Sequence, residues 1–189
     1  MVKVAILHEG NAKKTNDNEL LKLLIYHLGL DYQKVEFFGV GTKSNFFKSE
    51  SLVYKDLKLR IQEGAISKVL FISDADYKHN DLKYGGFDNC KEELGKMILN
   101  LNFSCTSDIY ITCNPQSKDG YLESLILSTI QEEEKKCIET FIKCSSFQSK
   151  SNDKAILNQI YKNAYPNAPF NFEHQNFDKL KQKLQNLFN

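Results

Sequence analysis

Three acidic residues directly follow apolar segments of the chain, in positions from which side chains could act on a ligand. Glu9 follows the apolar run 2–7, and Asp74 and Asp76 follow the run 69–72. In open α/β sheets, ligands bind beyond the carboxyl ends of the strands. Because residues two apart on an extended backbone point the same way, we expect Asp74 and Asp76 to present their carboxylates to one point.

Converging carboxylates repel one another, and a divalent cation removes this conflict. Mg²⁺, or Mn²⁺ in its place, takes oxygen ligands and leaves room for a phosphate oxygen. Such a site suits phosphodiester chemistry, in which the metal neutralises developing charge and activates water. We therefore expect Glu9, Asp74 and Asp76 to be catalytic residues and metal ligands. Glu9 is the better candidate for a general acid or base, because it stands alone on its own strand.

Two other interpretations of these acids stay open. An Asp-x-Asp pair by itself also occurs in turns and helix caps. A response-regulator receiver also carries acids at strand ends, but it needs an acidic pair after the first strand and a fifth strand ending in lysine. The chain offers only Glu9 after its first strand and no clear fifth strand.

Cationic side chains follow the same strand ends. Lys43 comes after the glycine turn that ends the second apolar run, and Lys78 and His79 come shortly after Asp76. They either bind phosphate groups or belong to solvated polar loops. Glu123 has two interpretations as well: a further metal ligand, or an ordinary acid on a helix surface.

Strand and helix patterns alternate over residues 1–114. Apolar, β-branched runs predict strands at 2–7, 35–40, 69–72 and 109–113. Apolar residues at steps of three and four predict helices at 16–28, 51–63 and about 90–101. This alternation predicts a parallel, Rossmann-like four-stranded α/β sheet flanked by helices. Structural turns are expected at Gly10, Gly39 and Gly41.

Residues 115–189 have a different, helical character. Helical periodicity predicts helices near 122–130, 138–142, 156–164 and 177–187. The last one has a clear apolar stripe, so we expect this C-terminal extension to pack on the α/β core. The polar, serine-rich segment 145–153 is the best candidate for a mobile loop.

Composition limits the partners and the cellular compartment that we expect for this protein. The net charge of +1 provides no overall field that would attract nucleic acid or a membrane. No run approaches the ~20 apolar residues of a membrane span. The five cysteines are odd in number and form no Cys-x-x-Cys pair, which predicts reduced, mostly buried thiols in a cytoplasmic protein. Neither a phosphate-binding loop nor a serine elbow is present.

The two acidic motifs resemble those of the Toprim domain, the catalytic domain of topoisomerases, bacterial primases and overcoming-lysogenization-defect nucleases. Ala5-Ile-Leu-His-Glu-Gly10 is similar to the family's acidic residue and glycine after the first strand. Ile72-Ser-Asp-Ala-Asp76 is similar to its Asp-x-Asp after the third strand, and Gly39-Val-Gly41 to its glycine turn. The pair Leu122-Glu123 resembles a motif of stand-alone bacterial Toprim-like proteins.

This resemblance covers residues 1–114 and implies a Toprim-like fold with Mg²⁺- or Mn²⁺-dependent phosphodiester chemistry on DNA or RNA. A nuclease-like protein is expected, because primases and topoisomerases need further domains that this length cannot hold. The alternative is a non-catalytic binding or regulatory module that acts with a protein partner. A protein partner could also supply substrate binding to a catalytic version.

Overall fold

Four parallel strands form a sheet in the order β2-β1-β3-β4. The computed structural model describes residues 2–10, 16–145, 156, 160, 162–164 and 170–189. The strands are β1 (Lys3–His8), β2 (Val35–Gly39), β3 (Ile66–Asp74) and β4 (Thr106–Thr112). The chain leaves β1 for β2 on one side and returns to β3 on the other, so the order reverses between β1 and β3. The predicted parallel four-stranded α/β sheet is confirmed.

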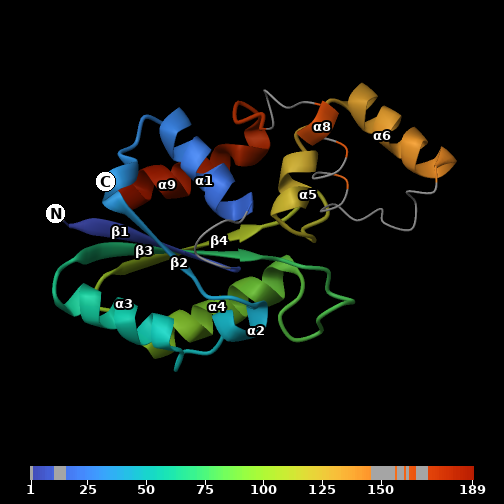
Figure 1. Cartoon of the computed structure of the whole chain (residues 1–189). Helices are drawn as coiled ribbons and strands as arrows, with labels where there is room; N and C mark the ends of the chain where they lie inside the picture. Colours follow the sequence, from blue (N-terminus) through green and yellow to red (C-terminus); the bar gives the residue numbers. More distant parts are fainter. Residues whose placement is uncertain (1, 11–15, 146–155, 157–159, 161, 165–169) are drawn as a thin grey trace.

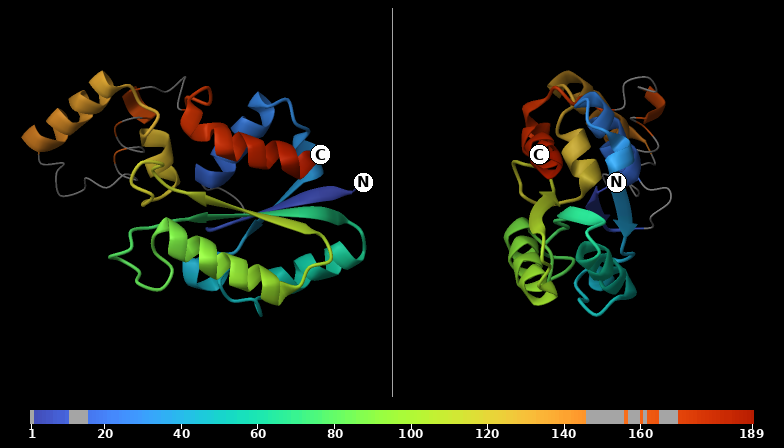
Figure 2. Two further views of the ribbon diagram at one scale, coloured as in Figure 1. Left: turned by 180° about the vertical axis from the view of Figure 1, so that it is seen from behind. Right: turned by 90° about the vertical axis from the view of Figure 1, so that its left-hand side faces the viewer.

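Helices cover both faces of this sheet (Figures 1 and 2). One face carries α1 (Asn16–His27), α5 (Leu122–Leu127) and α9 (Asp178–Phe188). The other face carries α2 (Lys43–Phe46), α3 (Leu52–Gln62) and α4 (Phe87–Leu101). The remaining elements are η1 (Tyr32–Lys34), α6 (Glu132–Cys144), α8 (Lys162–Ala164) and η4 (Gln175–Phe177).

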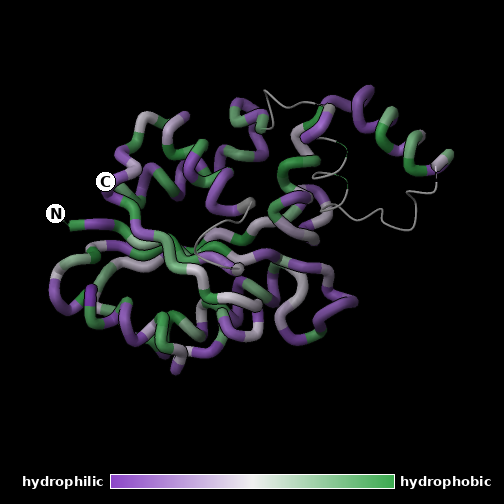
Figure 3. The backbone as a smooth tube through the Cα atoms, viewed as in Figure 1, coloured by the Kyte–Doolittle hydropathy of each residue, from purple (hydrophilic) through white to green (hydrophobic). Residues whose placement is uncertain are grey.

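The apolar runs of the strands are buried because each face of the sheet has its own hydrophobic core. In β1, Val4 and Ile6 belong to the core under α1, α5 and α9, and Ala5 and Leu7 belong to the core under α3 and α4. A strand buried on both faces needs apolar residues at successive positions, which is the pattern of parallel sheets. Figure 3 shows the apolar strands at the centre of the molecule.

The C-terminal helix α9 completes one of these cores. Leu180, Leu184 and Leu187 lie on one side of the helix and are buried with residues of β1 and β3. Lys183 of α9 also donates to Asp108 of β4, with Nζ–O distances of 2.6 and 2.8 Å. Helix α9, near the C-terminus, therefore packs on the sheet that contains the N-terminal strand β1.

Several predicted boundaries differ from the observed ones. Strand β3 begins at Ile66, before the predicted 69–72, and the helix predicted at 122–130 ends at Leu127. Helix α2 was not expected, because it has only four residues. The predicted mobile loop 145–153, except Ser145, and residues 157–159 and 161 of the helix predicted at 156–164 lie outside the described residues.

Two further observations concern composition. All five cysteines are free thiols: Cys90 and Cys113 are buried, whereas Cys137 and Cys144 are exposed. The expectation of mostly buried thiols therefore applies to only part of the set. Within the described part of the chain, no helix is both long enough and apolar enough to cross a bilayer.

Candidate functional site

The predicted acids lie where the strand order reverses, between the carboxyl ends of β1 and β3. His8, the last residue of β1, is in register with Ile72 of β3, so Glu9 lies beside Ser73 and Asp74, the last two residues of β3. A reversal of strand order opens a crevice at the carboxyl ends of the strands, because the neighbouring crossovers run to opposite faces. Topology alone thus brings the first and second acidic motifs together.

Glu9 is held against the end of β3 by hydrogen bonds to its Oε1. The Ser73 hydroxyl donates one, and the backbone N–H of Asp74 donates the other at 3.2 Å. Burial raises the pKa of Glu9, and the charge of Asp76 adds to this, while the Ser73 hydroxyl and Lys43 oppose it. Glu9 is therefore easier to protonate than an exposed glutamate.

Asp74 is held from the opposite side, by β4 and α5. Its Oδ1 accepts hydrogen bonds from Thr112 Oγ1 at 2.5 Å and from the backbone N–H of Leu122 at 2.9 Å. Leu122 is the first residue of α5, so Asp74 satisfies one of the N–H groups that a helix leaves unpaired at its start. The carboxylate is thus both a site acid and a cap for a helix distant in sequence.

Asp76 does not continue the strand, so the argument from an extended backbone was wrong. Strand β3 ends at Asp74, and Asp76 has a φ of 56°, in the left-handed region. Its backbone pairs instead with Gly120, with N–O distances of 2.7 and 3.3 Å. The side chain of Asp76 bonds with Lys43, whereas that of Asp74 bonds with β4 and α5.

Lys43 is bound inside the site and is not on a solvated loop. It is the first residue of α2, and its side chain is only 10% exposed. Its Nζ donates to three oxygens: Asp74 O at 2.6 Å, Ala75 O at 3.0 Å and Asp76 Oδ2 at 2.7 Å. An ammonium has three N–H donors, so this set uses all of them.

The surroundings of Lys43 keep it charged. Burial alone would lower its pKa, but neighbouring Cys90, Asp76 and Glu9 outweigh burial and raise that pKa. Burial raises the pKa of Cys90 itself to about 11, so this residue is a neutral thiol near neutral pH. The fixed charges of this part of the site are thus one ammonium and the nearby carboxylates.

Glycines join the loops that carry Glu9 and Lys43. Gly10 and Gly41 have φ values of 91° and 88°, and their backbones pair with each other at N–O distances of 2.6 and 2.9 Å. Glycine adopts such φ values without the steric cost that a Cβ brings. Gly39, the other predicted turn residue, is the last residue of β2.

Glu123 is the second residue of α5 and is buried, with 5% of its surface exposed. It therefore differs from an ordinary acid on a helix surface. Its neighbour Leu122 donates to Asp74, so the first turn of α5, which carries Glu123, begins beside that carboxylate. The sequence suggested this residue, but only the packing shows that α5 begins at the acidic cluster.

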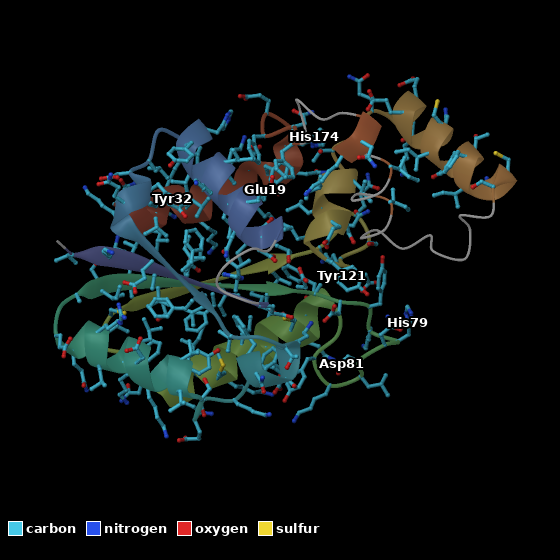
Figure 4. The ribbon with its side chains drawn as sticks, viewed as in Figure 1. Glu19, Tyr32, His79, Asp81, Tyr121 and His174 are labelled. Atoms are coloured by element: carbon cyan, nitrogen blue, oxygen red, sulfur yellow. The ribbon has the colours of Figure 1, made fainter. Side chains whose placement is uncertain are left out.

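Lys78 and His79 lie on the loop after β3, outside this cluster. Lys78 is exposed and lines a pocket of about 250 Å³ with Lys118, Asp88 and the start of α4. His79 is exposed, and its ring lies 5.5 Å from that of Tyr77. Figure 4 shows His79 on this loop, on the same side of the molecule as Tyr121, the residue before α5.

Sequence reasoning missed the residues that hold the acids. Ser73, Thr112 and Gly120 bond to Glu9, Asp74 and Asp76 respectively. Ser73 and Thr112 are polar residues that end apolar strands, which is a weak signal that could have been used. Gly120 gave no such signal, because its partner is set by the tertiary fold.

The residues fit a divalent metal in their chemistry but not in their present arrangement. Carboxylate oxygens are the ligands that Mg²⁺ and Mn²⁺ take. However, Asp76 Oδ2 is already paired with Lys43. Among the described residues, no group of three His, Cys, Asp or Glu side chains is placed to hold a metal ion.

Comparisons of the chain with protein-family models, with curated proteins and with solved structures found no significant match.

Proposed function

We propose that this chain is a nuclease-like, Toprim-like protein that performs metal-dependent phosphodiester chemistry on DNA or RNA. The observation that carries the proposal is the meeting of acids from separate elements at the switch in strand order. Glu9 follows β1, and Asp74 and Asp76 come at the end of β3. Glu123 is a buried acid in the first turn of α5, next to Leu122, whose N–H donates to Asp74. Within this group the pKa of Glu9 is raised, and perturbed pKa values are concentrated at functional sites, which favours a functional role.

The proposed roles follow from the contacts of each residue. Glu9 suits proton transfer, because the Ser73 hydroxyl and the Asp74 N–H, both at the end of β3, donate to the same carboxylate oxygen, Oε1, and so fix the orientation of the carboxylate. Asp74, Asp76 and Glu123 would supply further oxygen ligands for Mg²⁺ or Mn²⁺, and the metal would supply neutralisation of developing charge and activation of water. Lys43 inside the site and Lys78 and His79 on the outer loop after β3 are the proposed phosphate-binding residues.

Cleavage of labelled DNA and RNA with Mg²⁺ or Mn²⁺ tests this function. We expect wild type to cleave and Glu9→Gln to be slower by about 10²-fold or more, the usual loss when a general acid or base is removed. Glu50→Gln is the matched control, because Glu50 is an exposed glutamate outside the site. Absence of cleavage by wild type, or equal rates for wild type and Glu9→Gln, would contradict the proposal.

A second function is favoured by the Lys43 ammonium. This ammonium already pairs with Asp76 at 2.7 Å, so the acidic cluster has a counter-charge of its own. Such a site suits a binding or regulatory module that acts with a protein partner and performs no chemistry. Complex formation that survives Glu9→Gln, together with no cleavage by wild type, would support this module over the nuclease.

A further inference from the structure

The Lys43 ammonium occupies a cation seat, defined here as the oxygens Asp74 O, Ala75 O and Asp76 Oδ2. These three atoms lie 2.6, 3.0 and 2.7 Å from Nζ. Carbonyl and carboxylate oxygens that meet around one positive charge are also the ligands of hard divalent cations. The seat is therefore built to hold positive charge, and a side chain of this same protein fills it.

The backbone conformation after β3 creates the seat. Asp76 adopts a φ of 56° and pairs with Gly120 on both its N–H and its C=O. This turn places two backbone carbonyls and one carboxylate from three consecutive residues around one point. A non-glycine residue in this region of φ carries a conformational cost, and such residues are concentrated at functional sites.

The backbone that carries Lys43 is anchored, whereas its side chain is long. The Gly10–Gly41 pair fixes the chain before α2, and Tyr54 donates a 2.5 Å hydrogen bond to the carbonyl of the buried Phe46 at its end. A lysine has a flexible four-carbon stem, so its ammonium can leave the seat without any change in α2.

We propose that the Lys43 ammonium occupies this seat when no metal is bound, and that a divalent cation binds there by displacing the ammonium. An ammonium and a divalent ion repel each other and need the same oxygens, so the two occupants are mutually exclusive. The displaced ammonium stays tethered beside the site, where it can contact an anionic phosphate group. This inference rests on the proposed function, since it specifies how that site would take its metal.

Mn²⁺ affinity, measured by calorimetry, tests the competition. Lys43→Met removes the ammonium and keeps an unbranched side chain. Lys48→Met is the matched control, because Lys48 is exposed and its ammonium donates to Asn45, outside the seat. We expect Lys43→Met to bind Mn²⁺ tighter than wild type by about 5- to 150-fold, the usual range of coupling between two ligands. Lys48→Met should bind like wild type, and Asp76→Asn added to Lys43→Met should remove the gain.

Wild-type protein offers a second measurement that does not depend on a folded variant. Acetylation by an N-hydroxysuccinimide ester, read by mass spectrometry, reports which lysines are accessible. We expect Lys43 to be protected without Mg²⁺ and to become reactive as Mg²⁺ is added, while Lys48 reacts equally in both conditions.

The outcomes separate this inference from the proposed function. If wild type binds Mn²⁺, Lys43→Met binds it no tighter and Lys43 acetylation does not rise with Mg²⁺, displacement is overturned while the nuclease proposal stands. If no variant binds Mn²⁺, both are overturned. If Lys43→Met binds tighter and Mg²⁺ exposes Lys43, yet nucleic acid is not cleaved, displacement is supported and the nuclease proposal fails.

Discussion

Glu9 is a partly buried acid whose protonation is linked to the stability of the fold. Its pKa is raised chiefly by burial, so its charged form is less favourable in the folded protein than in the unfolded chain. The folded state therefore holds the Glu9 proton to higher pH than the unfolded chain does. Glu9 thus lowers the free energy of unfolding as the pH rises above the ordinary glutamate value of 4.5, and this cost is absent at lower pH.

The variant Glu9→Gln should consequently be more stable than wild type at high pH. Glutamine keeps an oxygen that can accept from Ser73 and from the Asp74 N–H, and it carries no charge. We expect its Tm to exceed that of wild type at pH 8 and the difference to shrink toward pH 4, where the glutamate is protonated in both states. Thermal melts across this pH range, with Glu50→Gln as control, measure the effect; a lower Tm for Glu9→Gln at pH 8 would contradict it.

At the scale of elements, Asp74 links the end of β3 to the start of α5. One carboxylate oxygen accepts from Thr112 of β4 and from the backbone of Leu122. The same residue that is proposed as a metal ligand therefore also helps to hold the helix that carries Glu123. Loss of activity in a variant that deletes this side chain would not distinguish the two roles.

Two substitutions at Asp74 separate these roles. Asp74→Ala removes the helix cap and should lower the free energy of unfolding by about 0.5–2 kcal/mol, the usual cost of losing a cap. Asp74→Asn keeps Oδ1 as an acceptor, so we expect it to retain most of the stability while it loses Mn²⁺ affinity. Urea unfolding and calorimetry measure both properties. Equal stability of Asp74→Ala and wild type would show that the contact with α5 contributes nothing to the fold.

At the scale of the whole molecule, the sheet needs its C-terminal helix. The core under α1, α5 and α9 combines residues of β1 and β3 with Leu180, Leu184 and Leu187. Removing α9 would expose the face of the sheet on which α5 also packs. The segment that places Glu123 and the last segment of the chain therefore depend on the same core.

Leu184→Ala tests this dependence. Leu184 has no exposed surface, and its truncation should lower the free energy of unfolding by about 2–5 kcal/mol through lost burial and a new cavity. Gln185→Ala, an exposed position on the same helix, should change it by less than about 0.5 kcal/mol. Urea unfolding followed by circular dichroism measures both; equal midpoints for the two variants would show that α9 does not support the core.

The sequence by itself determined the sheet and the place of its acids. Continuous apolar runs can be buried only between two layers, so strands such as β1 and β3 could be recognised without any knowledge of their neighbours. Residues that follow such strands must lie at the carboxyl edge of a parallel sheet. Glu9 and Asp74 could therefore be located from the sequence alone.

Tertiary structure decided what each acid contacts. Lys43 lies 33 residues from Asp76, and Leu122 lies 48 residues from Asp74, so no local pattern reports either contact. The left-handed backbone at Asp76 is likewise stabilised by Gly120, which belongs to another loop. Periodicity in a sequence indicates which side chains are buried, because residues on one face of a helix or strand recur at a fixed spacing. It does not record which distant polar groups meet, because that depends on how the crossovers bring the loops together.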